Sequence, residues 1–145
     1  MNRLTKLRND RGQTLFLAPI AFLIVVLLGG VVLEAGNLHL RQRQLDNLAD
    51  SIASDAAAVG FNIDEFRMSG SITIDPAAAN SVVQPAIDIS NLPTASGGGV
   101  TVNPGVEPEL EVTLTYVHQF VFGRQVFGAT STLQATGSAT LVPSG

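Results

Sequence analysis

The stretch RGQTLFLAPIAFLIVVLLGGVVLEAG, residues 11–36, decides the fold of this chain. Within it, residues 15–33 form a run of nineteen residues with neither a charge nor a side-chain amide. Coiled as an α-helix, this run is about 28 Å long, which is close to the hydrocarbon thickness of a bilayer. We therefore predict a transmembrane helix over residues 13–36 and take the lipid bilayer as the first partner.

Two alternatives to a plain anchor stay open. A secretory signal peptide normally has a shorter apolar core and leaves it through small residues, whereas this run leaves through Leu33-Glu34-Ala35, whose first residue is large. The second alternative is an anchor that also packs sideways against other helices. The anchor and the packing helix share one topology and differ only in their partners.

The charges on either side of the apolar run predict its orientation. Residues 1–12 carry four Lys or Arg side chains and one carboxylate, whereas the residues after the run carry four arginines and eleven carboxylates. Since basic flanks remain inside the cell, residues 1–12 are predicted to be a cytoplasmic tail and the acidic part to be extracytoplasmic, with the span in the cell membrane. An acidic outer part also argues against nucleic acid as a partner.

Residues 37–60 have the pattern of an amphipathic helix that extends the span. Their apolar residues recur at intervals of three and four along one stripe. The stripe consists of Leu45, Leu48, Ala49, Ile52, Ala53, Ala56 and Val59. We predict one rod from Thr14 to Val59, with Gly36-Asn37 as its weakest point and Gly60 as its C-cap. Leu45, Leu48 and Ile52 form the candidate helix packing face.

Residues 61–145 are predicted to be a β-rich domain. Apolar and polar residues alternate over residues 109–116 and again over 127–141, on either side of Gly123-Arg124, which predicts a long antiparallel hairpin. The apolar face of this hairpin needs a cover, and the stripe of residues 37–60 is the available one. Residues 71–75 fit a strand, 76–90 a short helix or a strand, and 100–102 a brief strand. The fold class is therefore α+β.

The sequence does not assemble a catalytic or cofactor site. There is no cysteine, His39 and His118 stand alone, and the triglycine at 97–99 lacks the lysine of a phosphate loop. We therefore expect no enzyme activity, no metal or other cofactor and no small-molecule substrate. Phe120, Phe122 and Phe127 gather at the hairpin tip and form a candidate patch for a partner or for the outer leaflet.

The order of these features resembles a known family. A basic tail, Arg-Gly-Gln, an apolar run with an early proline and then LRQRQLDNLADSIASDAAAVG are similar to TadE/TadG-like proteins of the bacterial tight-adherence (Flp) pilus machinery. The resemblance covers about residues 8–60 and is most specific in the L-x-N-x-A-D segment. The matching residues are Leu45, Asn47, Ala49, Asp50, Ala53 and the alanines at 56–58.

The resemblance implies a pilin-like, single-span envelope protein with a structural role in assembling a Flp-type pilus or a related secretion apparatus. It implies partners among the other pilus or secretion proteins, met through helix packing. It also implies a prepilin-peptidase site that cuts between Gly12 and Gln13. The fifth residue after that bond is Leu17, where processed prepilins usually carry Glu, and this favours the TadG-like branch. The alternative function is a membrane-anchored extracytoplasmic binding module unrelated to pili.

Overall fold

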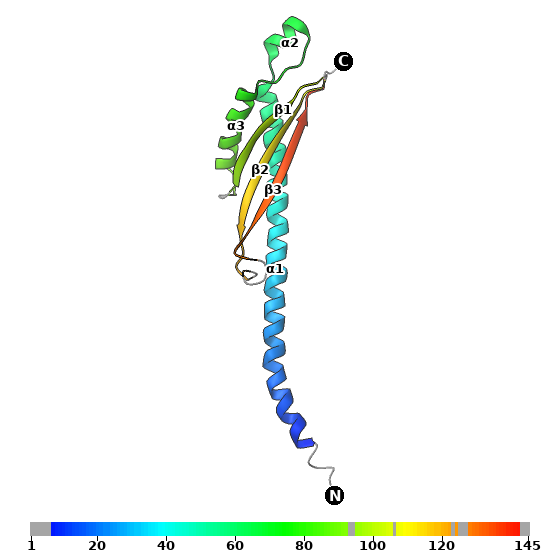
Figure 1. The fold of residues 1–145 in the computed structure, drawn as a ribbon, viewed down its shortest axis with the longest axis vertical. Helices are drawn as coiled ribbons and strands as arrows, with labels where there is room; N and C mark the ends of the chain where they lie inside the picture. The colour runs from blue at the N-terminus through cyan, green and yellow to red at the C-terminus, as the bar shows by residue number, and fades with distance from the viewer. Residues whose placement is uncertain (1–6, 93–94, 106, 123, 125–127, 143–145) are drawn as a thin grey trace.

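One long helix forms the spine of the molecule (Figure 1). The computed structural model describes residues 7–92, 95–105, 107–122, 124 and 128–142, with residues 7–16 described by their backbone alone. Helix α1 spans Leu7–Gly60, 54 residues, which corresponds to a rod of about 80 Å. The predicted long helix is therefore confirmed, and its end at Gly60 is as expected.

Two details of the predicted helix are wrong. The helix begins at Leu7 rather than at Thr14, so the second half of the basic tail is helical. It also continues without a break through Gly36-Asn37. A glycine inside a helix costs only about 1 kcal/mol relative to alanine, which does not suffice to interrupt a rod held by its neighbouring turns. Pro19 also lies inside α1, and the helix continues past it.

The connection between α1 and the sheet contains two helices. Helix α2 spans Ile63–Ser69, and its N-cap is Asn62, whose side chain accepts a hydrogen bond from the Glu65 N–H at 3.1 Å. Helix α3 spans Pro76–Asp88, and its N-cap is Asp75, whose side chain accepts a hydrogen bond from the Ala77 N–H at 2.9 Å. Of the two structures expected for residues 76–90, a short helix or a strand, the helix is the one found.

The predicted strand at residues 71–75 is wrong. Only an isolated bridge is present there, between Ile74 and Phe61. Asp75 and Pro76 are an N-cap and a first helical residue, both of which favour the start of a helix. They end the extended segment before it can lengthen into a strand.

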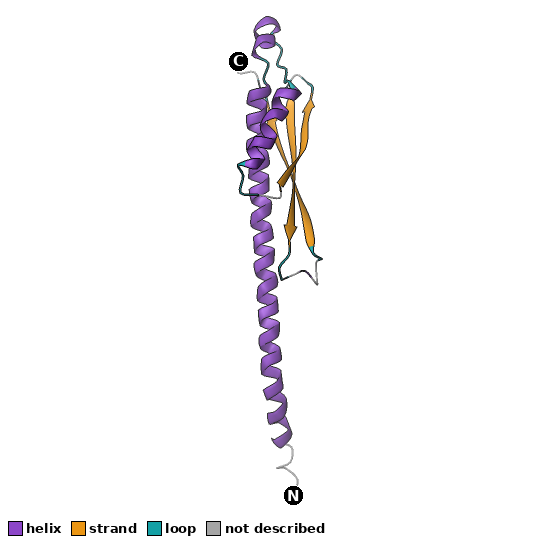
Figure 2. Cartoon of the chain, turned by 90° about the vertical axis from the view of Figure 1, so that its left-hand side faces the viewer, coloured by secondary structure: helices purple, strands orange, loops and turns teal. Residues whose placement is uncertain are grey.

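The sheet has three antiparallel strands in the order β1-β2-β3. Strand β1 spans Ala95–Asn103, longer than the brief strand expected, and has an irregularity between Gly97 and Gly99. Strand β2 spans Glu109–Gln119 and strand β3 spans Thr130–Thr140, with Leu114 opposite Ala135. The predicted hairpin is confirmed, and both of its strands lie along α1 (Figure 2).

A single core joins the second half of α1 to the sheet and α3. The buried stripe of α1 consists of Leu45, Ala49, Ile52, Ala53, Ala56 and Ala57. Strands β2 and β3 contribute Leu110, Val112, Leu114, Tyr116 and Ala135, and α3 contributes Ala79, Val83 and Ile87. The predicted boundary between residues 37–60 and 61–145 therefore passes through a shared core. The amphipathic stripe is the cover of the hairpin, as expected, although Val59 is exposed.

The first half of α1 has no such cover. Large apolar side chains from Leu17 to Leu33 are exposed around the helix, in contrast to the buried stripe beyond Leu45. Among the described residues, this is the one helix long and apolar enough to cross a membrane. Figure 1 shows it extending away from the sheet as a bare rod.

Candidate functional site: the helix–hairpin junction

Strand β2 delivers a histidine to the end of the apolar run. Alternate residues of β2 are buried, and this pattern continues past Tyr116 to His118, which is 4% exposed. The His118 ring lies between two aromatic rings, 6.5 Å from Tyr116 and 5.2 Å from Phe120 in an edge-on arrangement. His118 is therefore a packed residue of the strand.

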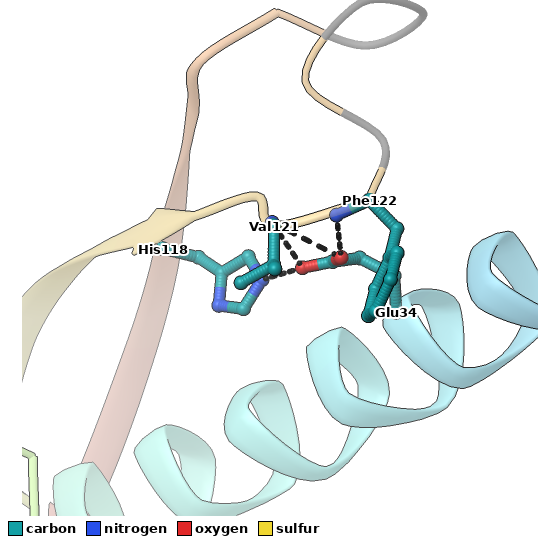
Figure 3. Close-up of polar contacts among 4 residues, drawn as sticks. All are labelled: Glu34, His118, Val121 and Phe122. Atoms are coloured by element: carbon teal, nitrogen blue, oxygen red, sulfur yellow. Dashed lines mark hydrogen bonds and ion pairs between the residues drawn. The ribbon is translucent and has the colours of Figure 1, made fainter.

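A buried carboxylate meets this histidine from the helix. Glu34 is the first charged residue after the apolar run, and it is 6% exposed. Its Oε1 atom lies 3.3 Å from Nε2 of His118, 84 positions away in the sequence. Figure 3 shows both side chains in the space between α1 and the end of β2.

The chain that leaves β2 folds over the same carboxylate. The Val121 N–H lies 3.1 Å from Oε1 and 3.1 Å from Oε2, and the Phe122 N–H donates to Oε2 at 2.7 Å. Both carboxylate oxygens thus accept hydrogen bonds from the loop (Figure 3). We call Glu34, His118, Val121 and Phe122 the helix–hairpin junction.

The ring of Phe122 completes the junction on the apolar side. A side chain added at Gly30 would meet the Phe122 ring at 3.2 Å, so the glycine lets this ring lie against the backbone of α1. Gly30 and Glu34 are four residues apart and therefore share one face of the helix. The same face thus offers a flat apolar contact and, one turn later, a carboxylate.

The chemistry of the junction is suited to holding the loop in place. A charged acceptor that receives backbone N–H groups fixes a loop more firmly than neutral hydrogen bonds do. The carboxylate also satisfies two loop N–H groups that are removed from the strand ladder. Among the described residues, no buried side-chain polar atom lacks a partner, so the junction is a closed network.

Replacing Glu34 is expected to release the loop. In Glu34→Ala, the N–H groups of Val121 and Phe122 lose their acceptor, and hydrogen exchange at these two amides should rise to the rate of an exposed loop. The amide of Leu114, in the middle of β2, should keep its protection. The matched control is Glu109→Ala, which removes an exposed carboxylate at the start of β2. Unchanged exchange at Val121 and Phe122 would contradict this role.

The other residues singled out from the sequence have separate positions. Gly12 and Gln13 lie within the helical backbone of α1. Leu45 and Ile52 are fully enclosed in the core of the chain itself, and Leu48 is partly buried against it. Leu45 and Ile52 of the candidate helix packing face are therefore occupied by the protein's own core and are not free to meet a partner, whereas Leu48 stays partly exposed.

The phenylalanines of the candidate patch at the hairpin tip differ in their exposure. Phe122 is 66% exposed, whereas Phe120 is half-buried beside His118. Phe127 lies outside the described residues. Val121, which the sequence pattern did not single out, is 76% exposed and belongs to the exposed tip.

Sequence reasoning did not identify Glu34 as part of a site. The available signal was its position, since a carboxylate directly after nineteen apolar residues needs solvent or a partner. Its donors are mostly backbone N–H groups, which nearly every residue type carries, so no residue pattern in the loop indicates them. Only the packing of the hairpin along α1 brings them together.

The chain was also compared with known protein families, curated proteins and solved structures. No protein-family model, curated protein or solved structure significantly matches this chain. The similarity to TadE/TadG-like proteins over residues 8–60 therefore stays a prediction from the sequence.

Proposed function

We propose that this protein is a single-span envelope protein with a structural, pseudopilin-like role in assembling a Flp/tight-adherence-type pilus or a related secretion apparatus. Its basic tail faces the cytoplasm, α1 crosses the cytoplasmic membrane, and the sheet lies on the extracytoplasmic side. The protein acts by packing against other subunits and not by catalysis.

The observation that carries this proposal is the division of α1 into two halves. The first half exposes apolar side chains on all faces, and the second half is the spine of a small α+β domain. The whole helix is continuous, so a force or displacement at one half is transmitted to the other. A subunit that packs in a membrane-rooted assembly needs this combination of an apolar stalk and a rigidly attached head.

The charge distribution supports the orientation. All eleven carboxylates after residue 33 belong to the outer part, and four of the five charges in residues 1–12 are cationic. Lys and Arg next to a span are retained in the cytoplasm during insertion. Glu34 is the only one of these carboxylates that adjoins the apolar run, and it is enclosed in the junction.

The assembly role is tested by cross-linking in the native bacterium. A photo-reactive amino acid at Leu33, which is exposed on the stalk, is expected to capture pilus or secretion subunits or a second copy of this chain. The control position is Met68 in α2, an exposed residue on the far end of the outer domain, which should capture fewer of them. Capture at Leu33 of lipid alone, with no such subunit, would contradict the assembly role and leave a plain anchor.

The intact mass of the mature protein is measured on material from the same cells. Full length indicates a retained anchor, and the loss of residues 1–12 indicates prepilin-type cleavage between Gly12 and Gln13. The loss of residues up to about 35 would indicate a secreted domain. That last result would contradict the proposed span.

The alternative function, a membrane-anchored binding module, is favoured by one open groove. The groove lies between α1 and the segment after α3, and most of its side chains are polar. Its lining residues are Gln44, Asn47, Leu48, Ser51, Ser90, Asn91 and Leu92. Binding of a soluble ligand that is lost in Asn47→Leu and retained in the outward-facing control Ser54→Leu would favour this function over the assembly role.

A further inference from the structure

We propose that Val121 and Phe122, which follow strand β2, insert into the outer-leaflet interface of the membrane that α1 crosses. The inference rests on the membrane span of the proposed function and adds a second point of membrane contact. The occupant of this apolar tip is lipid, at the boundary between headgroups and acyl chains.

The segment after β2 combines a fixed backbone with exposed side chains. The backbone N–H groups of Val121 and Phe122 are bound to Glu34, so the position of this segment is set by α1. Their side chains are nevertheless 76% and 66% exposed. An apolar surface that the fold holds outward marks a place where another apolar phase meets the protein.

Phe122 meets α1 at the level of the last turn of the apolar run. The Phe122 ring lies against Gly30, three residues inside the end of the apolar run. At 1.5 Å per residue, this contact is about 4.5 Å below the level of Leu33. A bilayer that covers residues 15–33 therefore includes the level at which the Phe122 ring meets α1. For comparison, amphipathic helices that lie in this boundary region bury their apolar face about 5–10 Å deep.

The exposed surface of Val121 and Phe122 is continuous with the exposed apolar surface of α1. Leu33, Glu34, Asn37, Val121 and Phe122 line one shallow crevice, so the tip adjoins the last exposed residues of the stalk. Leu33 is itself 72% exposed. The apolar surface of the span thus extends sideways onto the tip, and a lipid chain that covers Leu33 also covers Phe122.

The junction lowers the electrostatic cost of this placement. A bare carboxylate at the level of Glu34 would oppose contact with acyl chains. Its two oxygens are instead occupied by the N–H groups of the loop and the His118 ring. The loop therefore shields the charge on its inner side and presents apolar side chains on its outer side. Two contacts with the membrane, the helix and the tip, fix the height and the rotation of the outer domain.

The test measures depth in the bilayer with single spin labels. The chain contains no cysteine, so Val121→Cys, Val25→Cys and Ser138→Cys each provide one labelling site in the full chain. The variants are reconstituted in vesicles of phosphatidylcholine and phosphatidylglycerol. Accessibility to oxygen, which concentrates in lipid, is compared with accessibility to a water-soluble nickel chelate. Fluorescence of Tyr116, the only tyrosine of a chain without tryptophan, verifies that each variant retains its folded core.

The three positions distinguish the possible outcomes. We expect the oxygen-to-nickel accessibility ratio at residue 121 to be several-fold higher than at the exposed strand position 138, and lower than at residue 25 in the middle of the span. An aqueous ratio at 121 with a lipid ratio at 25 overturns the tip contact and leaves the span intact. Aqueous ratios at both positions overturn the span and the tip contact together. Dipolar broadening between labels at 121 that disappears on dilution with unlabelled protein would identify a second copy as the occupant, and also overturns the proposal.

Discussion

Gly137→Val is expected to separate the sheet from the long helix. Gly137 lies in β3, and a Cβ atom built on it would overlap backbone atoms of Ala49 and Asp50 in α1. These atoms belong to the helix backbone, which cannot rotate away as a side chain does. Since overpacking of a core typically costs 1–3 kcal/mol and occasionally more, we expect about 3 kcal/mol or more here. A small domain with a total stability of about 5–15 kcal/mol would be severely weakened.

The measurement is chemical unfolding of the full chain in a mild detergent, followed by Tyr116 fluorescence. Tyr116 is buried in β2, so its emission reports the sheet and not the apolar stalk. The control is Gly36→Ala, because a Cβ at Gly36 meets nothing within 4 Å and alanine favours the helix. The control should be neutral or stabilising. An unfolding midpoint for Gly137→Val equal to that of the wild type would show that the sheet does not rest on Ala49.

Leu45→Ala is expected to have the second largest effect. Leu45 is fully buried and is among the largest completely enclosed side chains of the core. Truncation of such a residue removes apolar burial and leaves a cavity, at a cost of about 2–5 kcal/mol. The prediction also decides what this residue is for, because a residue reserved for a partner subunit would contribute little to the stability of the isolated chain.

The matched control for Leu45 is Leu40→Ala on the same helix. Leu40 is 59% exposed, so the same substitution should change the free energy of unfolding by no more than about 0.5 kcal/mol. Both variants are compared with the wild type by the Tyr116 unfolding assay. Equal stability of the two variants would contradict the core role of Leu45 and would favour a role in contacting a partner.

Periodic patterns predicted the largest elements of this fold. Apolar residues at intervals of three and four led to the stripe that is buried at Leu45 and Ile52, and strict alternation led to the hairpin in which Leu114 lies opposite Ala135. Both patterns arise because one face of a helix or strand must be withdrawn from water. They can therefore be recognised within a short segment of the chain.

Short elements were predicted less well. Helix α2 was not expected, although Asn62 and Gly70 are its caps, because seven residues hold too few turns to show a period. The segment 71–75 alternates like a strand, yet the cap formed by Asp75 takes precedence. Here a local hydrogen bond from the Ala77 N–H to the Asp75 side chain outweighs the alternating pattern.

The amino-acid sequence alone determined that the chain has one long apolar helix, an amphipathic continuation and an antiparallel hairpin to be covered by it. These features follow from the spacing of apolar residues, which is local information. Only the tertiary structure decided that Gly137 lies on the backbone of Ala49 and that Glu34 holds the residues after β2. Such contacts join segments more than 80 positions apart through backbone atoms, and backbone atoms are the same in nearly every residue, so no local pattern specifies which of them will meet.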